Sequence, residues 1–257
     1  MKKTTIGVLM IVKNEQVHLE NCLESVKDWV DEIVIVDSGS TDNTAEIAAK
    51  YTDKFYVHSK WPGFGKQRQI AQSYMQSTWV LALDADEVVT EQLKETILNA
   101  VKENNQACCY KINRLSKAFG SYIKHSGWSP DWVLRLYPRT EMQYNDSLVH
   151  EQVDVPKGYI INKLEGNLLH FTFDNLSQYT QKTSLYISSW VDQREGRKKA
   201  SFSQAISHGF FRFIKMYFIQ KGFLDGRHGL LLAILSANVV FTRYADLWLR
   251  DYVKKNK

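Results

Sequence analysis

The chain has 257 residues, of which 44% are hydrophobic and 24% charged, a composition typical of a globular protein with a buried core. Its three cysteines, Cys22, Cys108 and Cys109, are an odd number without metal-ligand spacing, which excludes a disulfide framework and a zinc site and favours a reducing compartment. The net charge of +5 conceals an asymmetry: from Arg194 onward there are 13 basic and 4 acidic residues, whereas the remainder has 20 basic and 24 acidic residues.

The first predicted element is a buried strand over Ile6–Val12. The N-terminal stretch MKKTTIGVLMIVKNE has the basic and apolar residues of a signal peptide, but its apolar run is short and ends at Lys13 without a small-residue cleavage site. No uninterrupted run reaches the roughly 20 apolar residues that span a bilayer. We therefore expect a cytoplasmic protein.

Strand-like and helix-like segments then alternate up to residue 101. The patterns predict strands over Glu32–Val36, Phe55–His58 and Trp79–Leu83, and helices over Val17–Val26, 43–51, Lys66–Met75 and Glu91–Val101. This alternation, with continuous apolar strands, predicts an α/β fold whose mainly parallel sheet is flanked by helices. Ligands of open α/β sheets bind at the carboxyl ends of the strands, so the polar residues there are candidates for function.

Short strands are expected after Gln106, in ACCYKINRL, WVLRLYP, SLVHEQVDV and NLLHFTF. From Asn175 to the end the pattern is helical. We therefore expect a sheet domain over residues 1–174 and a helical, basic and aromatic region over residues 175–257.

Three acids follow the fourth strand in LALDADE: Asp84, Asp86 and Glu87. Carboxylates this close repel one another, so a positive charge is expected among them. An Asp-x-Asp at a strand end can hold a divalent cation, which neutralises charge on a departing diphosphate. The alternative is that Asp84 and Asp86 cap the following helix.

Two further strand ends carry polar groups. Asp37, in IVIVDSGSTDNT, can accept hydrogen bonds from a nucleoside, and Asp42 or Thr41 is the expected N-cap of the next helix. WPGFGKQRQ supplies glycines and two cations, Lys66 and Arg68, that suit phosphate. A solvated helix start is the alternative interpretation for Lys66.

Several nucleotide and hydrolase motifs are absent from the sequence. There is no G-x-x-x-x-G-K-[ST] loop, no G-x-G-x-x-G after the first strand, and no G-x-S-x-G. A P-loop hydrolase, a nicotinamide enzyme and a serine hydrolase are therefore excluded.

The segments IGVLMIVKNE, IVIVDSGSTDNT, GKQRQIA and LALDADE, in this order, resemble family 2 inverting glycosyltransferases of the GT-A fold over roughly the first half of the chain. PDWVLRLYP, VHE and LLHFTF further resemble the bacterial β-1,4-glucosyltransferases that add glucose to the heptose of the lipopolysaccharide inner core. One departure is Gln69, where members commonly carry Asn after the basic pair.

The resemblance implies a uridine diphosphate (UDP) sugar as donor. By position, Asp37 would hold the uracil or ribose, with Asn14 and Glu15 nearby. Lys66 and Arg68 would lie beside the nucleotide or the diphosphate.

The resemblance also implies a divalent metal, Mg²⁺ or Mn²⁺. Asp84 would contact the ribose or the metal, and Asp86 would bind the metal directly. His170, which follows an apolar pair, is a third candidate for a metal or phosphate ligand, with a structural histidine as the alternative.

An inverting transferase needs a base that deprotonates the acceptor hydroxyl, and its transition state resembles an oxocarbenium ion. Glu151, in VHE, is the first candidate and Asp131 the second. The alternative for Glu151 is an exposed strand residue paired with a lysine.

The C-terminal region interleaves aromatic residues with cations in GFFRFIKMYFIQKGF. GLLLAILSANVVF adds an apolar stretch that is expected to be too short to span a bilayer and that is interrupted by Ser236 and Asn238. Such helices suit an anionic membrane surface. The lipid-linked acceptor that the resemblance implies is made on the inner membrane, and it favours a peripheral protein on the inner face of that membrane. Packing on the catalytic domain or on a second subunit of an oligomer is the alternative.

We therefore predict a metal-dependent hexosyltransferase that moves glucose to a lipid-linked saccharide, the inner-core heptose. One alternative is a nucleotidyltransferase acting on a sugar phosphate, but IVKNEQ lacks the glycine- and arginine-rich phosphate loop of that class. Another is a non-enzymatic module that binds anionic surfaces, which leaves the strand-end acids unexplained. Because carboxylates oppose binding to a phosphate backbone, no nucleic-acid partner is expected.

Overall fold

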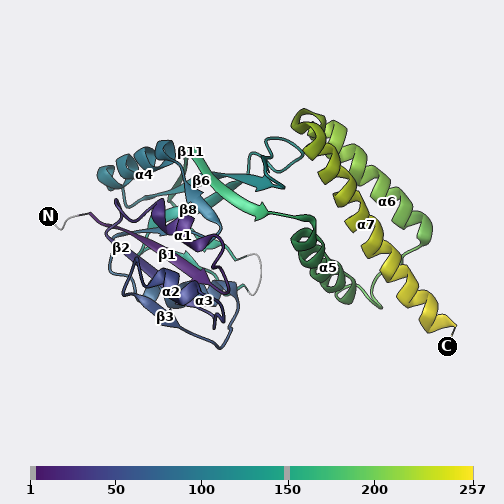
Figure 1. The fold of residues 1–257 in the computed structure, drawn as a ribbon, viewed down its shortest axis with the longest axis horizontal. Helices are drawn as coiled ribbons and strands as arrows, with labels where there is room; N and C mark the ends of the chain where they lie inside the picture. Colours follow the sequence, from purple (N-terminus) through teal and green to yellow (C-terminus); the bar gives the residue numbers. More distant parts are fainter. Residues whose placement is uncertain (1–3, 148–150, 257) are drawn as a thin grey trace. The chain divides into compact units, whose positions relative to one another are not determined.

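The structure, a computed structural model, describes residues 4–147 and 151–256. The chain forms two compact units (Figure 1), the first comprising Met1–Arg114 and Asp131–Phe171 and the second Leu115–Pro130 and Thr172–Lys257. The predicted division into residues 1–174 and 175–257 stays a prediction, because compactness alone does not show which part acts as a functional domain.

The strands are β1 (Ile6–Val12), β2 (Glu32–Asp37), β3 (Phe55–Val57), β4 (Trp79–Ala82), β5 (Glu87–Val89), β6 (Cys108–Ala118), β7 (Ser121–Tyr122), β8 (Trp132–Pro138), β9 (Gln143–Tyr144), β10 (Val153–Asp154) and β11 (Ile160–Phe173). The main sheet has the order β3-β2-β1-β4-β8-β6-β11-β5, with β7 paired to β6, and β10 pairs with β9 separately. Strands β1 to β4 pair in parallel, whereas β8 is antiparallel to both β4 and β6. The predicted α/β fold is confirmed, with parallel pairing among β1 to β4 and antiparallel pairing at β8.

Helices cover both faces of the sheet in the first unit: α1 (Leu19–Glu24), α2 (Thr44–Ala48), α3 (Phe64–Ser73) and α4 (Glu91–Glu103). Alternate residues of β1 explain the layering, because Val8 and Met10 pack in one core with α1 and α4, whereas Leu9 packs in a second core with α3. Strand β1 is buried almost throughout, as its continuous apolar run predicts.

Two predicted helix caps differ from those in the structure. Thr90 is the N-cap of α4, and its side chain accepts a hydrogen bond from the Leu93 amide, so Asp84 and Asp86 do not cap this helix. Asn43 occupies the N-cap position of α2 in place of the predicted Asp42 or Thr41. Asp42 still accepts a hydrogen bond from the Thr44 amide at 3.1 Å, which is the type of interaction that an N-capping aspartate makes.

Strand β8 contains a β-bulge at Arg135. Tyr110 of β6 is opposite Leu136, but the next residue, Lys111, is opposite Leu134. Arg135 is therefore an extra residue of β8 that has no partner opposite it on β6. Leu134 consequently packs in the same core as Tyr137, three positions away, although strict alternation would put them on opposite faces. The bulge changes the direction of the side chains along the part of β8 that borders the candidate site.

The second unit is mainly helical, which confirms the helical pattern predicted from Asn175. It contains α5 (Leu176–Asp192), α6 (Phe202–Ile214), a π-helical turn η1 (Lys215–Ile219), a 3₁₀ turn η2 (Gly222–Asp225) and α7 (Gly226–Lys255). Helices α6 and α7 approach closely at Gly209, where a Cβ atom would lie 3.1 Å from the Cβ of Phe241.

Helix α7 corrects one expectation. Together with η2 it forms a continuous helical segment, Gly222–Lys254, that is long and apolar enough to cross a membrane by length and composition alone. The apolar stretch with Ser236 and Asn238 was expected to be too short to span a bilayer, but the helix continues on both sides of it. Of its most apolar window, 28% is buried inside the protein.

Candidate functional site

Two buried arginines lie among the acids that follow β4. Arg68 of α3 is 3% exposed and Arg135 of β8 is 5% exposed. Arg68 Nη2 donates to Asp84 Oδ1 at 2.5 Å, and Arg135 Nη2 donates to Asp84 Oδ2 at 2.5 Å and to Glu87 Oε1 at 2.7 Å. Asp84 therefore bridges two guanidinium groups, and the chain itself supplies the positive charge that these crowded acids require.

The pKa values of the two acids shift in opposite directions. Burial by itself raises the pKa of Asp84, but Arg135 and Arg68 together outweigh burial and hold this pKa well below its usual range. Glu87 is completely buried, and burial raises its pKa above the ordinary value although Arg135 opposes the change. Asp84 is thus the permanently ionised member of the pair.

Strand β11 brings His170 next to Asp86. Strands β5 and β11 pair in antiparallel fashion with His170 opposite Glu87, and His170 Nε2 lies 3.3 Å from Asp86 Oδ2. Both side chains are partly exposed, at 13% and 26%. Over residues 4–147 and 151–256, no group of three or more His, Cys, Asp or Glu residues is placed to hold a metal ion. Asp86 and His170 would thus provide two ligands, and a bound ligand's oxygens and water would complete the coordination of a hard cation.

The carboxyl ends of β1 and β2 are joined by hydrogen bonds. Asp37 is 3% exposed and accepts from the amides of Gly39 and Ser40 and from Ser40 Oγ. Asn14 has a positive φ of 57°, its amide donates to Ser40 Oγ at 2.8 Å, and its side-chain oxygen accepts from the Thr41 amide. The structure therefore brings Asn14 and Asp37 together through one loop.

A small cavity of about 130 Å³ lies at the same strand ends. Glu15 lines it together with Ser38, Trp61 and Phe64. The predicted neighbours Asn14, Glu15 and Asp37 thus belong to one corner of the first unit, next to a cavity bordered by aromatic rings.

Lys66 lies apart from the buried arginines. Its side chain is 54% exposed, and its Nζ contacts Gln69 Oε1 at 3.0 Å and Asp146 Oδ1 at 3.8 Å. Gln69 Nε2 also donates to the Tyr144 carbonyl at 2.7 Å. The solvated-helix interpretation therefore describes Lys66 in this structure, and Gln69 ties α3 to the chain around β9.

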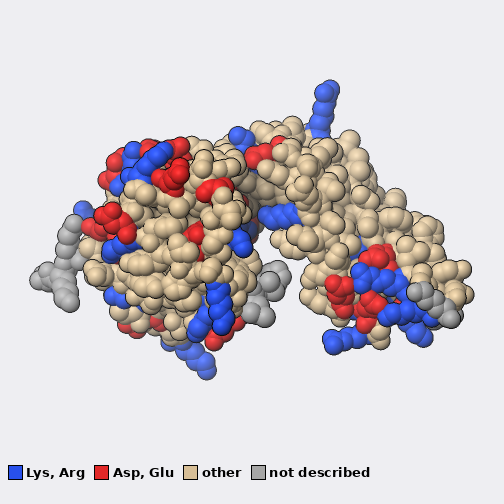
Figure 2. All heavy atoms as spheres, turned by 60° about the horizontal axis from the view of Figure 1, so that its bottom comes forward, with Lys and Arg blue, Asp and Glu red and all other residues tan. Residues whose placement is uncertain are grey.

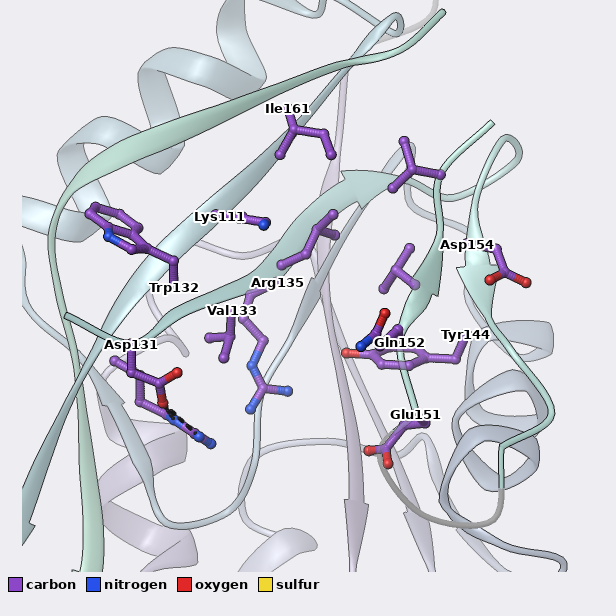
Figure 3. A pocket seen from close by; sticks show the side chains of 14 residues that line it. Lys111, Asp131, Trp132, Val133, Arg135, Tyr144, Glu151, Gln152, Asp154 and Ile161 are labelled. Atoms are coloured by element: carbon purple, nitrogen blue, oxygen red, sulfur yellow. Dashed lines mark hydrogen bonds and ion pairs between the residues drawn. The ribbon is translucent and has the colours of Figure 1, made fainter. Parts of the chain in front are cut away.

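A larger cavity of about 800 Å³ lies beside Arg135 (Figure 3). Both predicted bases line it: Asp131, at the start of β8, and Glu151, just before β10. Glu151 Oε1 accepts from Arg68 Nε at 3.2 Å, and Asp131 Oδ2 accepts from Arg114 Nη2 at 2.8 Å. The alternative that Glu151 is paired with a lysine is wrong, because its partner is Arg68. The Val and His of the VHE segment lie outside the described residues.

Sequence reasoning missed four residues of this site: Arg114, Arg135, Tyr144 and Lys111. Arg135 had a signal, because it is the one charged residue in the apolar strand WVLRLYP and a buried charge must be paired. Tyr144, whose ring centroid is 4.9 Å from the Arg68 guanidinium, gave none, because only the folded chain brings β9 next to α3.

Comparison with known proteins gives consistent results. The sequence model of the family Glycosyl transferase family 2 matches residues 7–166 of this chain. The lipopolysaccharide core biosynthesis glycosyltransferase LpsC of Rhizobium meliloti (strain 1021) is 30% identical over 95% of this chain and 94% of its own. The uncharacterized glycosyltransferase RT0209 of Rickettsia typhi (strain ATCC VR-144 / Wilmington) is 30% identical over 96% of this chain and 87% of its own.

Solved structures also align with the chain. Residues 1–349 of TarS from S. aureus, in complex with UDP-GlcNAc, align at a TM-score of 0.47 with 12% identity over 99% of this chain and 93% of that chain. Glucosyl-3-phosphoglycerate synthase from Mycobacterium tuberculosis, in complex with Mn²⁺, UDP and glucosyl-3-phosphoglycerate, aligns at 0.36 with 20% identity over 44% of each chain.

Proposed function

Because the chain belongs to glycosyl transferase family 2 and is a glycosyltransferase, we propose that it transfers glucose, with inversion, from a UDP-sugar to a heptose of the lipopolysaccharide inner core. The similarity to LpsC along almost the whole chain supports an acceptor from the lipopolysaccharide core. Four of the residues that the proposal assigns to the donor, Asn14, Glu15, Asp37 and Asp84, lie at the carboxyl ends of β1, β2 and β4, where ligands of such sheets bind.

The observation that carries this proposal is the bridge from Arg68 through Asp84 to Arg135. It lies beside the large cavity that both candidate bases line, and Asp84, whose side chain is 31% exposed, holds two buried guanidinium groups in place. Arg68 Nη1 is buried and has no hydrogen-bond partner among the described residues, and the proposal assigns this unpaired donor to a diphosphate oxygen. Rigid, desolvated donors aimed at developing charge are a major source of rate enhancement in enzymes.

Asp37, Asn14 and Glu15 would hold the nucleoside at the small cavity, and Lys66 would meet the diphosphate from solvent. The pair Asp86 and His170 would hold Mg²⁺ or Mn²⁺. When bound, the metal neutralises negative charge on the diphosphate.

Glu151 is the proposed base, with Asp131 second. The base takes the proton from the acceptor hydroxyl while the hydroxyl oxygen bonds to the anomeric carbon. The bond from that carbon to the diphosphate oxygen breaks on the opposite face, and UDP leaves with the electron pair. Arg68, whose Nε lies 3.2 Å from Glu151 Oε1, orients this carboxylate before the acceptor binds.

The second unit supports a peripheral position on an anionic membrane surface. Between residues 201 and 245 the chain has five basic residues and one acidic residue, Asp225. The same segment exposes large apolar side chains, among them Phe210, Phe211 and Ile219, which are 60%, 66% and 72% exposed. Aromatic and aliphatic side chains beside unbalanced cations suit the interface of an anionic bilayer.

The test is UDP release from a panel of UDP-hexoses, with and without Mg²⁺ or Mn²⁺, in the presence of a heptose-terminated core acceptor. We expect metal-dependent release from UDP-glucose. Glu151→Gln should bind the donor normally in calorimetry and lower turnover by about 10²–10⁴, the usual contribution of a general base. Asp86→Ala should abolish the metal dependence without changing the thermal unfolding temperature.

The exposed Glu165 provides a matched control, because Glu165→Gln makes the same chemical change outside the cavity. Equal turnover in Glu151→Gln and Glu165→Gln would remove Glu151 from the role of base. Absence of UDP binding by the intact chain would refute the assignment of the donor.

A further inference from the structure

The large cavity contains one cation that the surrounding ion pairs do not use. Lys111 of β6 lines the cavity, is partly buried, and has no hydrogen-bond or ion-pair partner in the described part of the chain. Figure 3 shows its side chain directed into the cavity. Partial burial of an ammonium group without an anion is unfavourable, so a charged partner would be bound there with a gain in free energy.

None of the acidic residues that line the cavity is paired with Lys111 in the described part of the chain. Asp131 is paired with Arg114, and Glu151 is paired with Arg68. The remaining acid of the lining, Asp154, is exposed on β10, and Figure 3 shows it on the opposite side of the cavity from Lys111. The described chain therefore offers Lys111 no internal counter-ion.

A second donor belongs to the same cavity wall. Arg135 is 95% buried, and its Nε is buried without a hydrogen-bond partner among the described residues, although its Nη2 is fully used by Asp84 and Glu87. A buried N–H without an acceptor costs free energy, and such a group in a native protein indicates a ligand or a water molecule that completes it.

We propose that this cavity binds the acceptor saccharide and that the acceptor carries an anionic substituent, a phosphate or a carboxylate, which Lys111 binds. Arg135 Nε donates to an oxygen of the same acceptor. The cavity also presents apolar side chains, including Trp132, Val133 and Ile161, that suit the apolar faces of a sugar ring. This inference rests on the proposed function, because it assigns the acceptor of that same site.

The position of Lys111 gives it a role in specificity. The accepting hydroxyl must reach Glu151 or Asp131, and both carboxylates line the cavity that Lys111 enters. An anionic group held by Lys111 therefore fixes the sugar in one orientation and selects which hydroxyl faces the base. Lys111 is a specificity-determining residue in this scheme, and it takes no part in proton transfer.

The test uses small sugars that carry a phosphate, a carboxylate or no anionic group. Mannose 6-phosphate, glucuronate and uncharged mannose are titrated into the full chain, each with and without saturating UDP. We expect mannose 6-phosphate or glucuronate to bind at least about tenfold more tightly than mannose, and the stronger of the two identifies phosphate or carboxylate as the preferred group. Lys111→Ala should remove the difference, and Lys111→Arg should retain most of it.

Lys157→Ala is the matched control, because Lys157 is an exposed lysine of the first unit that does not line the cavity. Equal affinity for charged and uncharged probes, no binding of any probe up to about 10 mM, or the same loss in Lys157→Ala as in Lys111→Ala would each overturn the inference. UDP binding is measured in the same titrations. Normal UDP binding with no selectivity for the anionic probes would refute the acceptor assignment and leave the donor assignment standing.

Discussion

At the scale of single residues, the site depends on how Asp84 is neutralised. A carboxylate that is buried alone is strongly destabilising, and Asp84 is tolerated because Arg68 and Arg135 each bind one of its oxygens. Each oxygen still has a lone pair, so a contact with ribose or metal remains compatible with these ion pairs. The role of Asp84 that this structure shows is thus to hold two arginines in position. A direct contact of Asp84 with the ligand would be made in addition to these ion pairs.

Removal of Arg135 should be costly because it leaves two acids without their main partner. We expect Arg135→Met to lower the free energy of unfolding by about 3–5 kcal/mol, the usual effect of breaking a buried ion pair. Urea denaturation measures this change. Arg197→Met, at an exposed arginine, is the control and should change stability by less than about 0.5 kcal/mol. Similar values for the two variants would show that Arg135 is not needed to compensate the buried acids.

Asp84 should also give the protein an acid-dependent stability. Its pKa is lowered on folding, so its ionised form stabilises the fold above the unfolded-state pKa of about 3.9, and this stabilisation is lost as the pH falls toward the lower folded-state pKa. The stability difference between the wild type and Asp84→Asn should be constant above about pH 5 and decrease by about 1 kcal/mol by pH 3. Urea titrations at several pH values measure it. A difference that grows in acid would contradict the lowered pKa.

At the scale of elements, α3 delivers Arg68 to the site, and Gly65 sets how closely this helix approaches its neighbour. A Cβ atom at Gly65 would collide with the carbonyl oxygen of Asn145, and the Gly65 amide donates to the Ser147 carbonyl at 3.3 Å. Arg68 lies on the same helix less than one turn further on. The orientation of its guanidinium therefore depends on a glycine that has no charge to contribute.

We expect Gly65→Ala to displace the start of α3 and lower the free energy of unfolding by about 1–3 kcal/mol, as overpacking usually does. Affinity for UDP should fall as well, because Arg68 moves with the helix. Urea denaturation and calorimetry measure the two effects. Ser73→Ala, at an exposed position of the same helix, should change neither. Normal stability and UDP affinity in Gly65→Ala would refute the close packing at this point.

The elements also show what the sequence could predict. Strand β1 was predicted with its observed bounds, Ile6–Val12, because a continuous apolar run needs no partner to be recognised. Strand β11 was expected from residue 167 but begins at Ile160, because its first residues, IINKLE, are mostly exposed and do not alternate between apolar and polar as a half-buried strand does. Strand β5 was missed, since three residues after an acidic turn become a strand only through pairing with β11.

In the candidate site, too, residues that are close in sequence could be predicted, whereas contacts that depend on long-range strand pairing could not. Asp86 and His170 were both predicted as metal ligands, and the structure brings them within 3.3 Å through the β5–β11 pairing, which no local pattern could reveal. The acids at the end of β4 were found because they are close in sequence. Their partner Arg135 was not assigned, because it reaches them across the sheet from β8.

At the scale of the whole molecule, charge is distributed unevenly along the chain. In Figure 2 acidic and basic groups of the second unit gather near its C-terminal end, where Arg250 pairs with Asp192 and Glu195, and much of its remaining surface in this view carries no charge. Lys215 and Lys221 are exposed cations without a hydrogen-bond or ion-pair partner within the described residues. This combination of exposed cations and uncharged surface is what the proposed attachment to an anionic lipid surface requires.

We expect the intact chain to float with vesicles that contain anionic lipid, to remain unbound with neutral vesicles, and to dissociate as salt is raised. Reversing two charges, Lys215→Glu with Lys221→Glu, should weaken binding by at least about tenfold, since each cation near the surface contributes about 1 kcal/mol. Lys102→Glu with Lys157→Glu, in the first unit, is the control. A dimer in size-exclusion chromatography together with no vesicle binding would favour the alternative of a second subunit.

The bulge in β8 also determines what a deletion in this strand would change. Because side chains alternate with a period of two, deletion of Arg135 would leave Leu134 and Tyr137 two positions apart and still on the same face, so the ladder with β6 would become regular without reversing either flank of β8. What the deletion would remove is the guanidinium that binds Asp84 and Glu87. The bulge therefore adds a buried arginine beside the strand-end acids while the neighbouring side chains of β8 keep the directions that a regular strand without this residue would give them.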